Sequence, residues 1–169
     1  ETPEAVPHAE AIGRASPRAV AMSLGGEDFA LAIGAEPSEA ALAVPKALLL
    51  HAARAAGLMP LGLTGTLAGF GDIDAFRAMA QRSRAMGFVG ASCINPAQVA
   101  PLNEAFTPSA DELAYAARVI AADGEAMAQG RGAVALDGRM IDIPIVVRAP
   151  RLLARAAAIR ARGTMAQPG

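Results

Sequence analysis

Two glycines and two carboxylates follow one another in the segment from Ser23 to Asp28, directly after an apolar stretch of the chain. Gly25 and Gly26 allow the backbone to approach a ligand closely and can direct amide N–H groups toward an anion. The carboxylates of Glu27 and Asp28 can bind a hard cation. The alternative is a glycine turn in which Asp28 caps the next helix, and this segment alone supports both interpretations equally.

Three other polar residues could take part in chemistry but have simpler interpretations. Glu1 offers a second carboxylate ahead of a helical pattern, although a terminal Glu carries no functional signal by itself. Asn95, followed by Pro96, could hydrogen-bond a ligand, but a turn before proline is the more common role. Asp142 precedes the last expected helix, where an N-cap is more common than a catalytic residue.

The histidines and the cysteine form no catalytic pattern. His8 and His51 lie in helical stretches without a Cys or His at ligand spacing, so we expect them to be structural or exposed. Cys93 is expected to be a small buried residue of a strand rather than a nucleophile. A single cysteine excludes an intrachain disulfide and a Cys-rich metal site, which fits a reducing cytoplasm.

Short apolar stretches and helical patterns alternate around these residues. Stretches bounded by turn residues predict buried strands over 17–24, 59–63 and 88–94. A helix is expected over about 45–54, with Pro45 in its first turn, and another over 73–86, between Asp72 and Gly87. This order indicates βα units on a parallel sheet, so we predict an α/β fold.

An open doubly wound sheet and a closed barrel share this order of elements. No Gly-x-Gly-x-x-Gly follows any expected strand, which favours the barrel. Because a complete (βα)8 barrel needs about 250 residues, this chain can supply only half of one. Active sites of such barrels lie at the carboxyl ends of the strands, where the Ser23–Asp28 segment is expected.

The pattern changes after residue 107, which predicts a second region over 108–169. A capping box of Ser109 and Glu112 begins a long helix that should end near Gln129, before Gly130 and Gly132. The stretch 133–141 predicts a small hairpin with Asp137-Gly138 at its turn. The last helix is expected to begin at Asp142 and Pro144 and to end near Gly163.

Composition limits the partners of this chain. It has 169 residues, 53% of them hydrophobic, and a formal charge of −1, with few aromatic side chains. Nucleic acid is therefore not an expected partner. No apolar run approaches the roughly 20 residues that span a bilayer, so no membrane association is expected. Residue 1 is Glu rather than Met, so we expect the chain to be part of a longer gene product.

Five segments, in order and spacing, resemble the latter half of citrate lyase β-subunit-like proteins. They are Glu1-Thr-Pro3, Gly25-Gly-Glu-Asp28, Cys93-Ile-Asn-Pro-Ala-Gln98, Asn103-Glu-Ala-Phe-Thr-Pro-Ser109 and Leu136-Asp-Gly-Arg-Met-Ile-Asp142-Ile-Pro144. Together they cover essentially the whole chain. They identify it as a relative of the HpcH/HpaI aldolase/citrate lyase superfamily, which includes the malyl-CoA and citramalyl-CoA lyases. The resemblance implies a TIM barrel whose C-terminal half is residues 1–107, with a helix-hairpin-helix lid over 108–169.

The resemblance also implies a Mg²⁺ site and a keto-acid site. Glu1 and Asp28 match the carboxylates that bind Mg²⁺ at the ends of successive barrel strands. The backbone around Gly26 and Glu27 would receive the carboxylate of a keto acid. The residues that match substrate-binding positions are Gly25, Gly26, Glu27, Asn95 and Pro96.

Asp142 matches an acid/base residue of the malyl-CoA lyase branch that reaches the active site of a neighbouring subunit. The resemblance therefore implies a homo-oligomer, a trimer or hexamer, with lids exchanged between subunits. Two positions depart from the family pattern, since Asn95 stands where His is usual and Gly62 where Asp is common. Asn cannot titrate, so an acid/base role at position 95 is lost. The family's first half, with a substrate-binding Arg and much of the CoA site, is absent from this chain.

The expected activity is Mg²⁺-dependent cleavage of a carbon–carbon bond in a β-hydroxyacyl-CoA thioester, which releases a keto acid and an acyl-CoA. One alternative is hydrolysis of an acyl-CoA thioester at the same site. Another is a non-catalytic assembly module or a fragment without independent activity. The 169-residue chain alone is expected to be incomplete as an enzyme.

Overall fold

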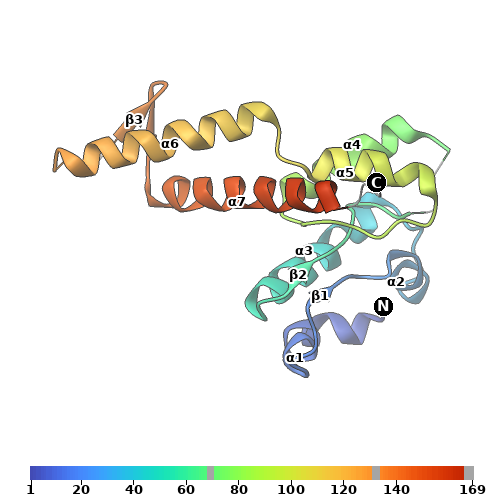
Figure 1. Cartoon of the computed structure of the whole chain (residues 1–169). Helices are drawn as coiled ribbons and strands as arrows, with labels where there is room; N and C mark the ends of the chain where they lie inside the picture. Colours follow the sequence, from blue (N-terminus) through green and yellow to red (C-terminus); the bar gives the residue numbers. More distant parts are fainter. Residues whose placement is uncertain (68–70, 131–133, 166–169) are drawn as a thin grey trace. The chain divides into compact units, whose positions relative to one another are not determined.

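The computed structural model describes residues 1–67, 71–130 and 134–165, and the chain divides into two compact units, Glu1–Phe106 and Thr107–Gly169. Figure 1 shows the elements of both units along the chain. The first unit contains η1 (Pro3–His8), α1 (Ala9–Arg14), β1 (Ala21–Met22), α2 (Gly26–Ala32), α3 (Glu39–Ala55), β2 (Met59–Pro60), α4 (Ile73–Met86), η2 (Pro96–Gln98) and α5 (Val99–Phe106). The second contains α6 (Ala110–Ala128), β3 (Val134–Leu136), β4 (Arg139–Ile141) and α7 (Ile143–Met165).

The first unit contains the parallel pairing that the sequence predicted. β1 and β2 are parallel, with Ala21 opposite Met59, and a parallel bridge joins Leu61 to Gly90. Each expected strand is shorter than predicted, and the stretch 88–94 forms only this single bridge. Pro60 has no N–H to donate, although its carbonyl accepts from Val89 N at 3.0 Å. The α/β class is confirmed, with short strands and many helices.

Helix α3 begins earlier than predicted. Its N-cap is Ser38, whose side chain accepts a hydrogen bond from Ala41 N at 3.2 Å. Pro45 therefore lies inside the helix, and its predicted place in the first turn is wrong. The Ser38 side chain satisfies an N–H of the first turn, whereas Pro45 removes one backbone hydrogen bond within the helix.

Helix α4 begins and ends where its sequence signals predicted. The Asp72 side chain accepts hydrogen bonds from Asp74 N at 3.1 Å and Ala75 N at 2.9 Å. Gly87 has a φ of 118°, in the left-handed region that a glycine adopts at a helix end. The N-cap of α2 is Gly25, so Asp28 lies within the first turn and its interpretation as the cap is wrong.

The core of the first unit joins its longer helices to the segments that carry the parallel pairing. Its buried members are Leu49, Leu50, Leu63, Phe76, Ala80, Phe88, Leu102, Ala105 and Phe106. They come from α3, α4, α5 and the stretches after β2 and α4. Burial of these side chains is the main force that holds the strand ends in place, since the short strands form few hydrogen bonds.

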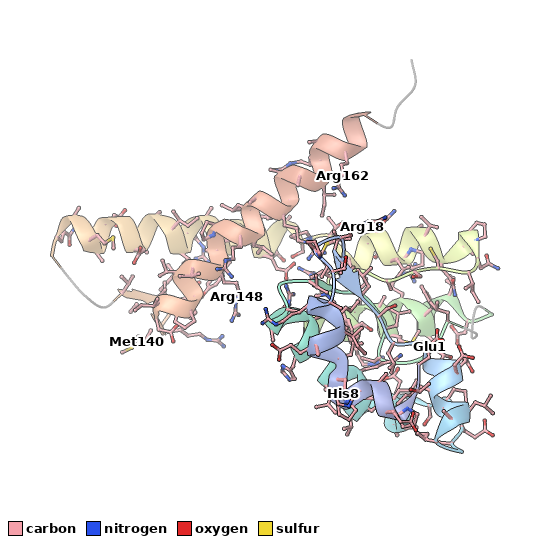
Figure 2. The ribbon with its side chains drawn as sticks, turned by 90° about the horizontal axis from the view of Figure 1, so that it is seen from below. Glu1, His8, Arg18, Met140, Arg148 and Arg162 are labelled. Atoms are coloured by element: carbon pink, nitrogen blue, oxygen red, sulfur yellow. The ribbon has the colours of Figure 1, made fainter. Side chains whose placement is uncertain are left out.

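The second unit follows its sequence signals closely. The Ser109 N–H donates to Glu112 at 2.7 Å, and the Glu112 N–H donates to Ser109 at 3.1 Å, which confirms the capping box. β3 and β4 form an antiparallel hairpin in which Asp137 and Gly138 have φ values of 54° and 74°. Met140 projects from this hairpin (Figure 2) and is 74% exposed.

The ends of the second unit differ slightly from the prediction. Helix α7 continues to Met165, two residues beyond Gly163. The expected hairpin residue Ala133 and the expected helix breaker Gly132 lie outside the described residues. A small core of Ala116, Val119, Ile141 and Ala149 lies between α6, the hairpin and α7. Among the described residues, no helix combines the length and the apolar character needed to cross a bilayer.

Candidate functional site

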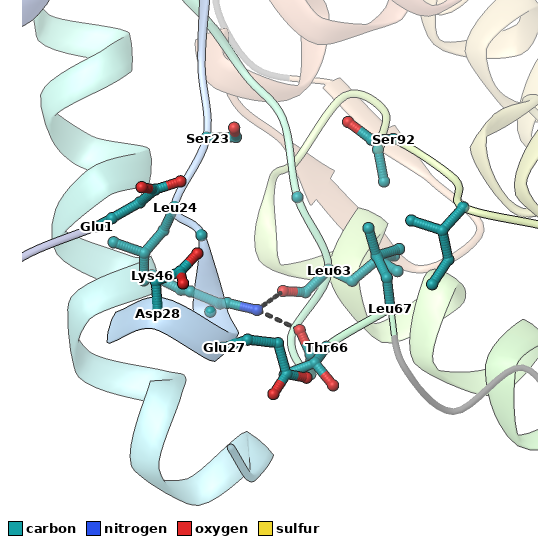
Figure 3. Close-up of a pocket in the computed structure, with 16 residues that line it drawn as sticks. Glu1, Ser23, Leu24, Glu27, Asp28, Lys46, Leu63, Thr66, Leu67 and Ser92 are labelled. Carbon is teal, nitrogen blue, oxygen red and sulfur yellow. Dashed lines mark hydrogen bonds between the residues drawn. The ribbon is translucent and has the colours of Figure 1, made fainter. Parts of the chain in front are cut away.

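A cavity of about 370 Å³ opens where the parallel segments of the first unit end. Most of its lining comes from the segments 23–28, 62–67 and 91–94, and Glu1 and Lys46 complete it (Figure 3). Each of these segments follows one of the paired stretches, β1, β2 or the bridge at Gly90. The cavity is therefore at the carboxyl ends of the parallel strands, as the sequence predicted for the site.

Glu1 and Asp28 both line this cavity, on the side formed by the β1–α2 turn (Figure 3). A Cβ at Gly25 would lie 2.7 Å from the Glu1 carboxylate oxygen Oε1. Only glycine therefore allows the Glu1 side chain to lie against this turn. Residues 1 and 28, far apart in sequence, are brought to one cavity, with the Gly25-Gly26 backbone beside them.

The two carboxylates fit the needs of a Mg²⁺ ion. In the part of the chain that the structure describes, no group of three or more His, Cys, Asp or Glu side chains could hold a metal. Mg²⁺ does not need such a cage, because it is commonly bound through one or two carboxylates and keeps several of its waters. Glu1 and Asp28 can therefore hold Mg²⁺, with water and a ligand in the remaining positions.

Lys46 is a residue of the cavity that sequence reasoning missed. It is only 4% exposed, and its Nζ donates to the carbonyl of Leu63 at 2.7 Å and to the carbonyl of Gly65. Burial lowers the pKa of the Lys46 ammonium from 10.5 to about 8, although Glu39 and Glu27 favour its charged form. A lysine in the middle of the apolar run from Ala40 to Leu50 was the available signal.

The segment 63–65, whose carbonyls accept the Lys46 bonds, is also hydrogen-bonded to helix α4. Ser83 of α4 is fully buried, and its Oγ accepts from Thr64 N at 2.8 Å and donates to the Met79 carbonyl at 2.7 Å. A Cβ at Gly65 would lie 2.7 Å from the Met79 sulfur. This wall of the cavity is thus fixed between α3 and α4.

An ion pair joins the same two helices farther out. Arg82 of α4 donates to the Glu39 carboxylate, with its Nε 3.3 Å from Oε2, and this hydrogen bond lowers the pKa of the Glu39 carboxyl. Both side chains are about half exposed. The pair contributes little to stability, because solvent screens exposed ion pairs.

Asn95 and Pro96 do not occur among the described residues that line the cavity. The Asn95 side chain accepts from Ala97 N at 2.9 Å, so its interpretation as a turn residue is confirmed. Gln98, which sequence reasoning also missed, is fully buried and accepts from Ile94 N at 2.9 Å. Its amide donates to the Leu67 carbonyl at 3.1 Å, which ties two walls of the cavity together.

The predictions made for Cys93 and for the two histidines have different outcomes. Cys93 is exposed, so the prediction of a buried strand residue is wrong. Among the described residues the parallel pairing of this stretch is the bridge at Gly90, so Cys93, three residues later, lies beyond it. His8 and His51 are both exposed, which was one of the expected alternatives.

Asp142 belongs to the second unit, at the start of α7. Its carbonyl accepts from Ile145 N at 3.0 Å and Val146 N at 3.1 Å, and its exposed side chain is 3.4 Å from Ile145 N. The side-chain bond is long, so the carboxylate is only weakly engaged at the helix start. Asp142 therefore remains accessible for another interaction.

This chain is similar in sequence to L-malyl-CoA/beta-methylmalyl-CoA lyases and to citrate lyase beta subunits. It is 35% identical over 180 residues to an L-malyl-CoA/beta-methylmalyl-CoA lyase of Cereibacter sphaeroides, covering 95% of this chain and 56% of the relative. It is 36% identical over 158 residues to citrate lyase subunit beta of Haemophilus influenzae, covering 92% and 54%. The chain thus spans about half the length of these curated relatives.

The structure is similar to that of CitE from Mycobacterium tuberculosis, solved in complex with magnesium, acetoacetate and coenzyme A. The TM-score is 0.78 at 30% identity, and the match covers 92% of this chain and 58% of CitE. A citrate lyase from Burkholderia xenovorans has the same fold, with a TM-score of 0.77. The model of the HpcH/HpaI aldolase/citrate lyase family matches residues 1–96, more than half of the sequence. The chain belongs to the HpcH/HpaI aldolase/citrate lyase family.

Proposed function

We propose that this chain carries the metal and keto-acid half of a Mg²⁺-dependent lyase that cleaves a β-hydroxyacyl-CoA thioester of the citryl, malyl or citramalyl type. The observation that carries the proposal is the cavity at the strand ends, where Glu1 and Asp28 lie beside the Gly25-Gly26 backbone. Malyl-CoA lyases among the relatives support the substrate class. The magnesium, acetoacetate and coenzyme A bound to CitE support the ligands.

The reaction breaks the bond between the carbinol carbon and the α-carbon of the thioester. The hydroxyl gives up its proton to solvent and becomes the carbonyl of the keto acid. The electron pair stays on the α-carbon as an enolate, which then takes up one proton to give the acyl-CoA. Bound Mg²⁺ would supply Lewis-acid polarisation of the keto oxygen and orient the neighbouring carboxylate. Glu1 and Asp28 would hold the ion, and the backbone from Gly25 to Glu27 would bind the keto-acid carboxylate. The lining combines carboxylates and hydroxyls with large aliphatic side chains, and a cavity of about 370 Å³ has room for a small keto acid.

Asp142 is the proposed proton carrier at the α-carbon of the acyl-CoA. Positioned acid/base groups of this kind contribute about 10² to 10⁴ in rate. Its weak bond to the start of α7 leaves the carboxylate accessible to a substrate. We propose that it acts in the site of a neighbouring subunit of a homotrimer or homohexamer, with residues 108–169 as the lid and residues 1–107 as half of a TIM barrel.

The proposal is tested by assaying the complete gene product against citryl-, malyl- and citramalyl-CoA with and without Mg²⁺, and by identifying the products. We expect a keto acid and a shorter acyl-CoA to form only when Mg²⁺ is present. Free CoA with the intact hydroxy acid would show a thioesterase instead. Turnover that persists in excess EDTA would contradict the role given to Glu1 and Asp28.

A further inference from the structure

Lys46 places a buried positive charge in the wall of the cavity. Burying an ammonium is costly unless hydrogen bonds replace its water, and a core lysine could be replaced by an apolar side chain at little cost. The partners of Lys46 are two backbone carbonyls, those of Leu63 and Gly65, rather than a carboxylate. These bonds compensate for the loss of hydration of the charge only while the backbone of residues 63–65 keeps its present conformation.

The two bonds tie α3 to a segment that lies outside it in sequence. Leu63 and Gly65 belong to the wall that follows β2, and Figure 3 shows the Lys46 ammonium reaching across to it. The same Nζ lies 3.5 Å from the position that a Cβ would take on Gly26. The Lys46 ammonium therefore lies between the β1–α2 turn and the opposite wall of the cavity.

The charged groups around Lys46 come from three helices. Glu27 is on α2, Glu39 is on α3, and Arg82 of α4 is paired with Glu39. Since Arg82 engages Glu39, the carboxylate nearest to Lys46 on its own helix is partly neutralised. The ammonium consequently adds positive potential to a cavity whose other charged side chains, Glu1, Glu27 and Asp28, are acidic.

We propose that Lys46 is a positioning residue of the keto-acid site, which holds the Leu63–Gly65 wall against the Gly26 turn so that a small carboxylate fits between them. The inference rests on the proposed function for the identity of the ligand. Its structural part, the fixing of the wall by the lysine bonds, can be measured without any substrate.

The test compares Lys46→Met and Lys46→Arg with the wild type in the complete gene product, and Arg82→Met is the matched control. Hydrogen exchange of the peptide covering 61–67 measures how firmly the Leu63–Gly65 wall is held. Calorimetry with pyruvate and Mg²⁺ measures the affinity of the keto-acid site. Steady-state kinetics gives KM and kcat for the CoA ester. Arg82→Met removes the exposed ion pair between α3 and α4 and leaves the Lys46 bonds intact.

We expect Lys46→Met to speed exchange of this peptide about tenfold or more, as the loss of hydrogen bonds to a charged group predicts. Pyruvate affinity should fall and KM should rise by about the same factor, with kcat changed less. Lys46→Arg keeps the charge and several donors but is larger, so it should recover part of both effects. Arg82→Met should remain within about twofold of the wild type in each measurement.

The proposal is overturned if the 61–67 peptide of Lys46→Met exchanges at the wild-type rate. It is also overturned if exchange is faster but pyruvate affinity and KM are unchanged. If Lys46→Met does not fold, Ser83→Ala decides, because it releases Thr64 on the other side of the same wall. The proposal then requires faster local exchange together with weaker pyruvate binding in Ser83→Ala. A wild type that cleaves no CoA ester would refute the proposed function, whereas the exchange and pyruvate measurements would still test Lys46.

Discussion

The two units of this chain are specified in different ways. In the second unit, the capping box at Ser109 and the Asp137-Gly138 turn determine where elements begin and end, and each signal spans a few residues. In the first unit, the cavity depends on contacts between distant positions, such as Glu1 with Gly25 and Lys46 with Gly65. Local signals thus build the elements of the second unit, and long-range contacts build the site of the first.

The largest effect should come from the proposed metal ligand. In the complete gene product, we expect Asp28→Asn to weaken Mg²⁺ binding and to lower kcat/KM by about 10² to 10³, the range found when a strong electrostatic contact is lost. Asp74→Asn is the control, because Asp74 also lies in the first turn of a first-unit helix but outside the cavity. Wild-type activity and wild-type Mg²⁺ dependence in Asp28→Asn would show that Asp28 is not a ligand.

A complementation experiment tests whether the second unit contributes to the chemistry. Asp28→Ala and Asp142→Ala proteins should each be inactive, because one lacks a metal ligand and the other a proton carrier. Co-expressed mixed oligomers should regain activity where an intact metal site meets an intact Asp142 of a neighbour. The two proteins mixed without subunit exchange should regain none.

Two outcomes of this experiment would change the assignment of Asp142. No recovery in mixed oligomers of verified composition would place its action within its own subunit. Full activity in Asp142→Ala, with stability lowered by about 1 kcal/mol, would mean that Asp142 serves only as a helix cap. The second unit would then have a structural role only, and the chemistry would belong to the first unit.

The pH dependence of stability should separate Lys46 from the locally specified parts of the chain. The pKa of Lys46 is lowered from 10.5 to about 8 by burial, so the folded state loses this proton at lower pH than the unfolded state does. Below pH 8 both states are protonated and the cost of the buried charge is fully present. As the pH rises from about 8 to 10.5, that cost is relieved, and stability increases by up to about 3 kcal/mol.

The measurement is the difference in unfolding free energy between the wild type and Lys46→Met at several pH values, because titrations common to both proteins cancel. The difference should move in favour of the wild type above pH 8. A difference that stays constant from pH 7 to 10.5 would show that the Lys46 ammonium is not significantly desolvated.

The extent to which the sequence predicted this structure follows the same division. Helix α4 was predicted to the residue, because the Asp72 cap and the Gly87 stop are short-range signals. The start of α3 was predicted wrongly, since Pro45 resembled a first-turn residue and the Ser38 cap was overlooked. Exposure of Cys93 could not be predicted, because it depends on where the pairing with a distant segment ends.

The candidate site was predictable only in part for the same reason. The Gly25–Asp28 turn was visible as a cluster after an apolar stretch, and the structure places it in the cavity. Lys46 was missed because its carbonyl partners lie 17 and 19 residues away in sequence, and the bond from Gln98 to Leu67 was missed because it spans 31 residues. For Lys46, a polar side chain within an apolar helical run is the signal that could have identified it, since buried polar groups require hydrogen-bond partners.

The smallest expected effect is the one that tests the contrast most directly. Ser109→Ala removes the side-chain bond to Glu112 N and should lower the stability of the second unit by about 1 kcal/mol. Because this cap acts only on the first turn of α6, pyruvate affinity and exchange of the 61–67 peptide should stay at wild-type values. Calorimetric melting and the pyruvate titration used for Lys46 measure both. A loss of pyruvate affinity in Ser109→Ala comparable to that expected for Lys46→Met would show that the helix cap and the keto-acid site are coupled, and that the local and long-range parts of this chain do not act independently.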